Sequence, residues 1–193
     1  MAAEPLHILI ADPHTRGGGQ VAYVTRLGGA LHRMGHRVVV ACRPNSTLAA
    51  EAARVGCEPL DKLHFARGLR MLPWTGDLLL LRRYLRSTPP DIVHVNGSQD
   101  HWACALVNQS LGHPVCLLRT RHNTYAVKNS WANRKLNRVW TDYQIVVCDV
   151  VRETLAKQPP FRRDRMTTIH NGVDADLFQP DADSRDLCWS AGV

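Results

Sequence analysis

The stretch LHILIADPHTRGGGQVAYVTRLGGALHRMGHRVVVAC, residues 6–42, decides the fold. Its apolar start, residues 6–11, predicts a strand, and apolar residues at helical spacing predict a helix from Gln20 to Met34. A second apolar run, residues 37–42, predicts another strand. The three consecutive glycines, Gly17, Gly18 and Gly19, lie between the first strand and the helix. The order strand, glycine turn, helix, strand is that of a βαβ unit.

The rest of the chain continues this alternation. We expect further strands at residues 57–60, 92–95, 114–118, 143–148 and 166–169, and helices at 47–54, 77–86, 102–111, 130–140 and 150–157. Residues 61–76 are expected to form a loop, with a helical turn as the alternative for part of it. Strands that are apolar along their whole length are covered on both faces, as in parallel sheets. The pattern therefore predicts an α/β fold with a doubly wound, mainly parallel, Rossmann-like sheet over residues 1–170. The polar, turn-rich residues 171–193 resemble a linker.

Composition limits the classes of partner. The chain has 193 residues, of which 45% are hydrophobic, and its formal charge of +7 favours an anionic partner. None of its six cysteines forms a Cys-x-x-Cys pair, which favours reduced thiols over a zinc or disulfide framework. No secretory signal is visible, and the leucine run at residues 78–81 is too short to span a bilayer. We expect a cytoplasmic protein that meets a membrane only at its surface, with no metal site.

Polar residues gather where the predicted strands end. In a doubly wound sheet, ligands bind beyond the carboxyl ends of the strands. Backbone amides at a glycine turn and the positive end of a helix dipole suit a phosphate, a carboxylate or a sugar hydroxyl. The candidate site residues at these ends are Asp12, His14, Arg16, Gly17, Gly18, Gly19, Asn96, Ser98, Arg119, Arg121, His122 and Asn123. His94 fits a hydrogen-bonded core position and a site position equally well.

A dinucleotide-binding interpretation stays open at this point. Gly17, Gly19 and Ala22 fit the pattern G-x-G-x-x-A. The loop of residues 12–16 is longer than dinucleotide binders have, and the second strand ends near Arg43 instead of the acidic residue that holds a ribose. Because Arg43 suits a phosphorylated ribose, an NADP-binding Rossmann domain of an oxidoreductase is the alternative.

A basic stretch follows the fifth predicted strand. It carries no acid and has two interleaved tryptophans, Trp131 and Trp140; its basic residues are Arg119, Arg121, Lys128, Arg134, Lys135 and Arg138. Such a stretch is either a solvated face or a patch for an acceptor phosphate or an anionic membrane surface. Nucleic acid is not expected, because no nucleic-acid-binding motif accompanies the charge. A third hypothesis is therefore a non-catalytic module that binds an anionic lipid or glycan.

Three motifs resemble family 4 type glycosyltransferases. Gly17-Gly18-Gly19 followed by Leu31-x-x-x-Gly35-His36-x-Val38 resembles the opening of that family, and residues 90–96, PDIVHVN, resemble its next marker. Residues 169–180, IHNGVDADLFQP, resemble the hinge that joins its two domains. Residues 119–122 and 100–102 resemble a bacterial subgroup associated with lipopolysaccharide sugars.

The resemblance implies a GT-B architecture, in which two Rossmann-like domains face each other. The N-terminal domain mostly holds the acceptor and the C-terminal domain holds a nucleotide-diphosphate sugar, which is transferred with retention of configuration and without a cofactor or a bound metal. By this resemblance, the amides of Gly17–Gly19 lie near the donor diphosphate or the reacting sugar, and His122 lies near the transferred sugar or the acceptor. Asp12 and His14 are candidates for a general base, and Asn171 of the hinge belongs to the binding residues.

The resemblance also implies that a donor-binding half follows the hinge. The family's signature of two glutamates separated by seven residues is absent from the sequence. We therefore expect residues 171–193 to be the hinge and the start of a C-terminal domain supplied in cis or in trans, and the chain alone to be weakly active or inactive. The expected acceptor is a glycan or a lipid-linked glycan, the product a cell-envelope polysaccharide, and the location the inner face of the cytoplasmic membrane.

Overall fold

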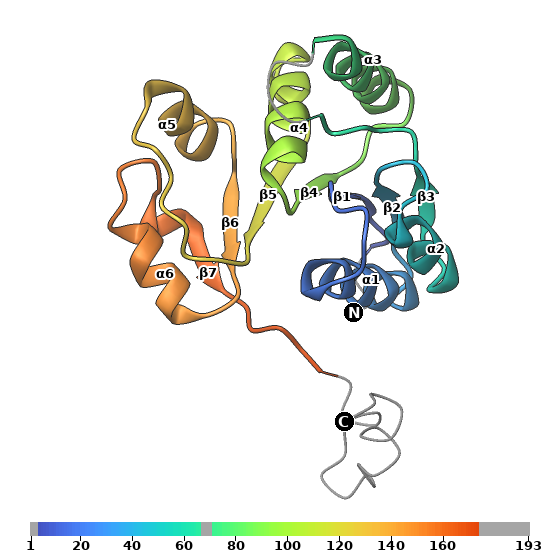
Figure 1. The fold of residues 1–193 in the computed structure, drawn as a ribbon, viewed down its shortest axis with the longest axis horizontal. Helices are drawn as coiled ribbons and strands as arrows, with labels where there is room; N and C mark the ends of the chain where they lie inside the picture. The colour runs from blue at the N-terminus through green and yellow to red at the C-terminus, as the bar shows by residue number, and fades with distance from the viewer. Residues whose placement is uncertain (1–3, 67–70, 174–193) are drawn as a thin grey trace, which may run out of the picture.

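The structure is a computed structural model that describes residues 4–66 and 71–173. Within these residues, seven strands form one sheet in the order β3-β2-β1-β4-β5-β6-β7, and every neighbouring pair is parallel (Figure 1). The strands are β1 His7–Ala11, β2 Arg37–Ala41, β3 Glu58–Leu60, β4 Ile92–Val95, β5 Cys116–Arg121, β6 Tyr143–Val146 and β7 Met166–Thr168. The predicted α/β fold with a doubly wound, Rossmann-like sheet is confirmed.

Helices cover both faces of the sheet (Figure 1). They are α1 Gly19–Arg33, α2 Thr47–Arg54, α3 Met71–Ser87, α4 Ser98–Ser110, α5 Trp131–Arg138 and α6 Asp149–Ala156, with a 3-10 turn at Arg163–Arg165. One buried apolar cluster joins α1 and α2 to β1 and β2, and a larger one joins α3, α4 and α5 to the opposite face. A third cluster joins α6 to β6 and β7. Successive residues of a strand point to opposite faces, so the unbroken apolar strands predicted from the sequence supply both layers.

The sheet brings the carboxyl ends of its central strands together. β1 pairs with β4 so that Ala11 lies beside Val95, and β4 pairs with β5 so that Val95 lies beside Arg119. The connections that leave these ends start at Asp12, Asn96 and His122. Three of the predicted polar clusters therefore share one edge of the molecule, as the carboxyl-end rule requires.

Three predicted boundaries differ from the structure, and those of β5 and α4 lie at the site. Residues 71–76 belong to α3 instead of a loop: Pro73 lies in the first turn of the helix, where its missing N–H is not needed. β5 runs to Arg121 instead of ending at Leu118, so Arg119 and Arg121 are strand residues. α4 also begins earlier, at Ser98, because Asp100 Oδ2 accepts hydrogen bonds from the backbone N–H groups of Asn96 and Gly97 and caps the first turn.

Some sequence predictions fall on residues outside the described part. Residues 67–70 of the expected loop and residues 174–193 of the expected hinge region lie there. Among the described helices, none combines the length and the apolar character needed to cross a bilayer.

Candidate functional site

The glycine turn leaves the start of α1 uncovered. α1 begins at Gly19, its N-cap Gly18 offers no side-chain hydrogen bond, and its first turn contains no acid. A Cβ added to Gly17, Gly18 or Gly19 would meet no more distant part of the described chain within 4 Å, so the space beside each of these glycines is open. Gly18 alone has a φ, 153°, that other residues rarely adopt. An anion or a sugar hydroxyl can therefore approach the first amides of α1 closely.

Asp12 anchors the loop that carries the glycines. Its carboxylate is fully buried; Oδ1 accepts from the backbone N–H of His14 at 2.8 Å and lies 2.8 Å from His14 Nδ1, and Oδ2 accepts from Gln20 Nε2 at 2.7 Å. A Cβ on Gly97 would collide with the ring of Pro13, so the loop also packs tightly on the β4–α4 turn. These contacts fix the loop and orient the His14 ring, whose side chain is about half exposed.

His122 meets Asn96 across the ends of β4 and β5. Asn96 Nδ2 donates to the carbonyl of Ala11 at 3.2 Å, which turns Asn96 Oδ1 toward His122 Nε2 at 3.3 Å. This arrangement assigns the ring proton to Nε2 and leaves the Nδ1 lone pair to accept a hydrogen bond. Burial lowers the pKa of His122 to about 4. The negative charge of Asp12 acts to raise this pKa and the positive charge of Arg119 acts to lower it further, and the ring is neutral at pH 7. A neutral imidazole suits a hydroxyl better than a phosphate.

A polar chain beneath His122 links it to α1. The ring of Tyr23 meets the His122 ring edge-on with centroids 4.7 Å apart, and Tyr23 Oη lies 3.2 Å from Thr120 Oγ1. Thr120 Oγ1 lies in turn 2.6 Å from Nε2 of the buried His94. The sequence predictions missed Tyr23 and Thr120, and they left His94 open between core and site. His94 is a hydrogen-bonded core histidine that supports the site from below.

His94 predicts a pH-dependent stability. Burial, with contributions from His122 and Arg119, lowers the pKa of His94 to about 4. In the unfolded chain a histidine gains its proton below about pH 6.5, whereas the folded protein keeps His94 neutral down to about pH 4. The free energy of unfolding therefore keeps its full contribution from His94 above pH 6.5, and that contribution falls by up to about 3 kcal/mol as the pH drops to 4. We expect the difference in unfolding free energy between the wild type and His94→Gln, measured by urea titration, to shrink over that range.

Comparing the wild type with His94→Gln removes the opposite pH dependence that Asp100 gives to the free energy of unfolding. Burial raises the pKa of Asp100 to about 6, so its own contribution is lost as the pH rises from about 4 to 6. Asp100 is present in both proteins and cancels in their difference. His170→Gln, at an exposed position, serves as the control. A difference between wild type and His94→Gln that stays constant from pH 7 to pH 4.5 would contradict this role.

The two arginines of the predicted site are buried. Arg119 is 4% exposed and Arg121 is 9% exposed, because both lie inside β5 instead of on the loop that follows it. Arg119 feels the charges of Asp100 and Asp12, and Arg121 lies over the ring of Phe161 at 5.4 Å. They therefore lie beneath the surface at which His122 and Asn96 meet.

The remaining predicted residues lie around this centre. Arg16 and Ser98 are exposed on the loops before α1 and at the start of α4, and Asn123 Oδ1 accepts from the backbone N–H of Tyr125 at 3.3 Å. Arg43, which the dinucleotide interpretation requires for a ribose phosphate, donates instead to the carbonyl of Phe65 at 2.7 Å.

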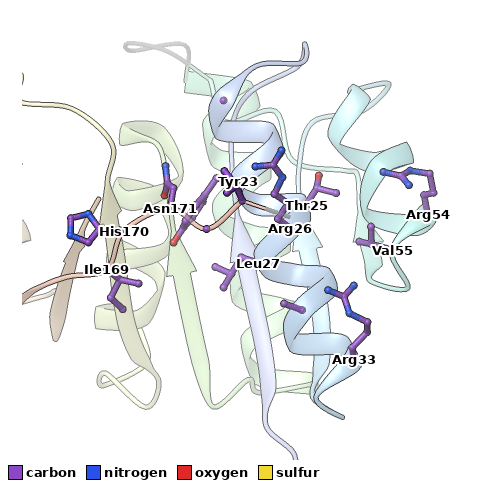
Figure 2. A pocket seen from close by; sticks show the side chains of 14 residues that line it. Tyr23, Thr25, Arg26, Leu27, Arg33, Arg54, Val55, Ile169, His170 and Asn171 are labelled. Atoms are coloured by element: carbon purple, nitrogen blue, oxygen red, sulfur yellow. The ribbon is translucent and has the colours of Figure 1, made fainter. Parts of the chain in front are cut away.

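A groove beside the glycine turn includes Asn171. It has a volume of about 670 Å³ and lies between α1, the end of α2 and the segment 169–173 that follows β7. Figure 2 shows Asn171 near Tyr23, with Arg26 and Arg33 further along α1 and Arg54 on α2. The structure therefore brings Asn171 to the helix that starts at the glycine turn. In the described part of the chain, no three His, Cys, Asp or Glu side chains are placed to hold a metal ion.

Comparisons with known proteins bear on the family and the fold of the chain. The model of the family described as Glycosyltransferase Family 4 matches residues 17–177. A glycosyltransferase from Rickettsia africae is 19% identical, with a TM-score of 0.81 over 99% of this chain and 50% of its own. Anabaena Alr3699/HepE, solved in complex with UDP and glucose, is 13% identical, with a TM-score of 0.73 over 97% of this chain and 50% of its own.

The lipopolysaccharide outer core galactosyltransferase WaaB is also similar. It is 11% identical, with a TM-score of 0.63 over 91% of this chain and 49% of its own. The chain thus spans about half the length of these solved structures. At these identities the likeness shows the fold alone, one Rossmann-like half of a GT-B architecture. A comparison with curated protein sequences found no match.

Proposed function

Because the chain belongs to Glycosyltransferase Family 4, we propose that it forms the acceptor-side half of a retaining glycosyltransferase that uses a nucleotide-diphosphate sugar. The observation that carries the proposal is the meeting of the open glycine turn, Asn96 and His122 at one sheet edge. The family assignment favours sugar transfer over the NADP alternative, and the engagement of Arg43 with Phe65 agrees with this.

The site offers orientation and charge stabilisation. The first amides of α1 and its helix dipole suit the donor diphosphate or the reacting sugar, where they stabilise negative charge that develops on the leaving group. The neutral His122 ring accepts a hydrogen bond from a sugar hydroxyl and fixes its position. No cofactor is required for this chemistry.

Asp12 and His14 form a carboxylate–imidazole pair at the same edge. With Nδ1 of His14 held by Asp12, the imidazole is the better placed of the two to receive the proton of the acceptor hydroxyl. Asp12 itself is fully buried and bonded at both oxygens, so we assign it the positioning of His14 and Gln20. Asn171 lies where the chain would pass to a donor-side half, and it lines the same groove as Gly19.

The test is sugar transfer with both halves present. The chain is joined to, or mixed with, a donor-side domain of a family 4 glycosyltransferase and assayed with a panel of UDP-, GDP- and ADP-sugars for release of the nucleotide. We expect turnover with at least one sugar nucleotide and weak or no turnover from this chain alone. Absence of transfer and of nucleotide binding across the panel, with both halves folded and associated, would refute the proposal.

The basic face of α5 supports an acceptor held at an anionic lipid surface. Trp131 is 73% exposed, and Lys135 Nζ lies 5.0 Å from the centre of its ring. α5 also carries Arg134 and Arg138 and no acid. An exposed tryptophan beside several cations is typical of helices that lie at a membrane interface. A lipid-linked glycan of the cell envelope would be presented at such a surface, and the protein would then be peripheral to the inner face of the cytoplasmic membrane.

Vesicle flotation tests this surface. Each cation near an anionic bilayer contributes about 1 kcal/mol, so Lys135→Gln with Arg138→Gln is expected to weaken binding to phosphatidylglycerol vesicles about 30-fold. High salt is expected to release the wild type, and vesicles of phosphatidylcholine alone are expected not to bind it. Arg82→Gln with Arg83→Gln, on α3, removes the same charge elsewhere. Equal losses in the two double variants would mean that net charge alone, and not α5, attracts the membrane.

The same surface favours one second candidate function. If flotation succeeds and sugar transfer fails with every donor, the chain is a non-catalytic module that binds an anionic lipid or glycan. The exposed Trp131 and the acid-free α5 are the observations that favour it.

A further inference from the structure

Buried polar atoms without a hydrogen-bond partner concentrate beneath the site. Of the eleven such side-chain atoms among the described residues, six belong to Asp100, Arg119, Arg121 and Gln144, which we call the buried arginine cluster. These atoms are Asp100 Oδ1, Arg119 Nε and Nη1, Arg121 Nε, and Gln144 Oε1 and Nε2. Buried polar groups in folded proteins are almost always paired, with protein, ordered water or a ligand, so this concentration makes the cluster a candidate site for a polar ligand.

The cluster is one continuous group. Arg119 and Arg121 are two residues apart in β5 and therefore point to the same face of the sheet. Gln144 of β6 is the register partner of Arg119, and Asp100 in the first turn of α4 is the acid that acts most strongly on Arg119. All four residues are nine-tenths buried or more.

The charges of the cluster are unbalanced at Arg121. Arg119 feels two carboxylates, those of Asp100 and Asp12. No described carboxylate forms a salt bridge with Arg121, and the charged group that acts on it is the like-charged Arg119. Burying a cation without an anionic partner costs free energy, and an anion bound at Arg121 would offset that cost.

A surface connection closes over Arg121. Arg121 Nη2 donates to the carbonyl of Tyr125 at a long 3.4 Å, and Tyr125 is 77% exposed. The connection from β5 to α5, residues 122–130, contains no helix or strand (Figure 1). Its hydrogen bonds to distant elements include His122 to Asn96 at the start and Val127 to Gln158 further on. The Tyr125 carbonyl is thus a weak, replaceable partner at the outer side of the cluster.

We propose that the buried arginine cluster binds an anionic group of the acceptor, a phosphate or a carboxylate, which replaces the Tyr125 carbonyl as the partner of Arg121. An anion at Arg121 would accept a hydrogen bond that is charged on both sides, which is stronger than the long hydrogen bond to the neutral Tyr125 carbonyl. This inference rests on the proposed function, because it assigns the substrate class of that same site.

Thermal unfolding of the 193-residue chain with four probes tests the proposal: glucose 1-phosphate, glucuronate, inorganic phosphate and glucose. We expect an anionic sugar, and not glucose, to raise the melting temperature of the wild type. A larger rise in melting temperature with glucose 1-phosphate than with glucuronate indicates a phosphate site, and the reverse indicates a carboxylate site. Inorganic phosphate shows whether the charge alone is enough.

Arg121→Met is expected to weaken binding of the anionic sugar at least tenfold, since it removes a charge-assisted hydrogen bond. Arg83→Met, at an exposed position of α3, is expected to bind like the wild type.

Stability separates binding from a structural role. Because Arg121 lacks an acid partner, Arg121→Met is expected to melt at or above the wild-type temperature without ligand. Gln144→Met, which keeps both arginines, is expected to fold normally and to bind about fivefold more weakly for the loss of one hydrogen bond. Unfolding of both variants would show that the cluster only supports the fold and would overturn the proposal.

Two other results would also overturn it: no anion-dependent stabilisation of the wild type, or unchanged binding by Arg121→Met. Full-rate sugar transfer by Arg121→Met to an anionic acceptor would refute the cluster while leaving the proposed function intact. Anion binding that requires Arg121, in a protein that transfers no sugar, would leave the cluster standing and refute the proposed function.

Discussion

Replacing Gly19 with alanine is expected to lower kcat/KM for sugar transfer about 100-fold without destabilising the chain. A Cβ at Gly19 meets nothing within 4 Å, and the residue opens α1 without a positive φ. Alanine is also the better helix former, so stability is expected to hold or rise. The loss would come from the methyl group occupying the space through which the donor diphosphate or the reacting sugar approaches the backbone amides. The rate of nucleotide release measures this loss in the two-half assembly, which is this chain joined to or mixed with a donor-side domain.

Gly76→Ala is the matched control for Gly19→Ala. Gly76 lies within α3, far along the chain from the glycine turn, and a Cβ there also meets nothing within 4 Å. We expect this variant to retain full transfer activity and to gain up to about 1 kcal/mol of stability. Gly18→Ala is less informative, because its φ of 153° strains any side chain. Full activity in Gly19→Ala would mean that no ligand approaches this turn.

Replacing His122 with alanine is expected to lower kcat/KM between about 100- and 1,000-fold. Its Nε2 is held by Asn96 and its ring by Tyr23, so Nδ1 is presented in a fixed position to a sugar hydroxyl. Since its pKa is lowered to about 4, His122 stays neutral between pH 6 and 8, and its contribution to the rate is expected to be constant over that range. The ratio of wild-type to variant kcat/KM, measured at several pH values, tests both statements.

His113→Gln is the control for that experiment. His113 lies within 3.1 Å of both carboxylate oxygens of Asp142, in the connection that leads into β5 at the opposite edge of the sheet. We expect His113→Gln to lower stability modestly and to leave the rate of sugar transfer nearly unchanged. If His122→Ala transferred sugar as fast as His113→Gln, the edge at which β4 and β5 end would not be the reacting surface.

The sheet was predictable because its signal is redundant. The strand, glycine turn and helix of residues 6–34, followed by a second apolar strand, allow one common topology, and each later apolar run extends it. β5 was the exception: Arg119, Thr120 and Arg121 have the polarity of a loop, and hydropathy cannot tell a buried polar strand from an exposed turn. The error at β5 therefore hid the burial of the two arginines.

The site was predictable to the extent that it follows from topology. The rule that ligands bind at carboxyl ends placed Asp12, Asn96 and His122 at one edge, and their contacts bear this out. The sequence did not predict Tyr23 as a site residue, because a tyrosine on an amphipathic helix has the spacing of a core residue. It did not predict Thr120, because this threonine lies between two arginines. Tyr23 and Thr120 join the site through each other, across 97 residues of sequence, and Thr120 also contacts His94, 26 residues away; no local pattern encodes such contacts.

Hydrogen–deuterium exchange of the two-half assembly, with and without a sugar nucleotide, tests the central claim most directly. We predict ligand-dependent protection at residues 12–22, 95–98 and 120–124, the segments that meet where β1, β4 and β5 end. Protection confined to the opposite edge, at residues 88–91, 111–115 and 140–142, would contradict the account, because the sugar nucleotide would then bind away from both the glycine turn and His122.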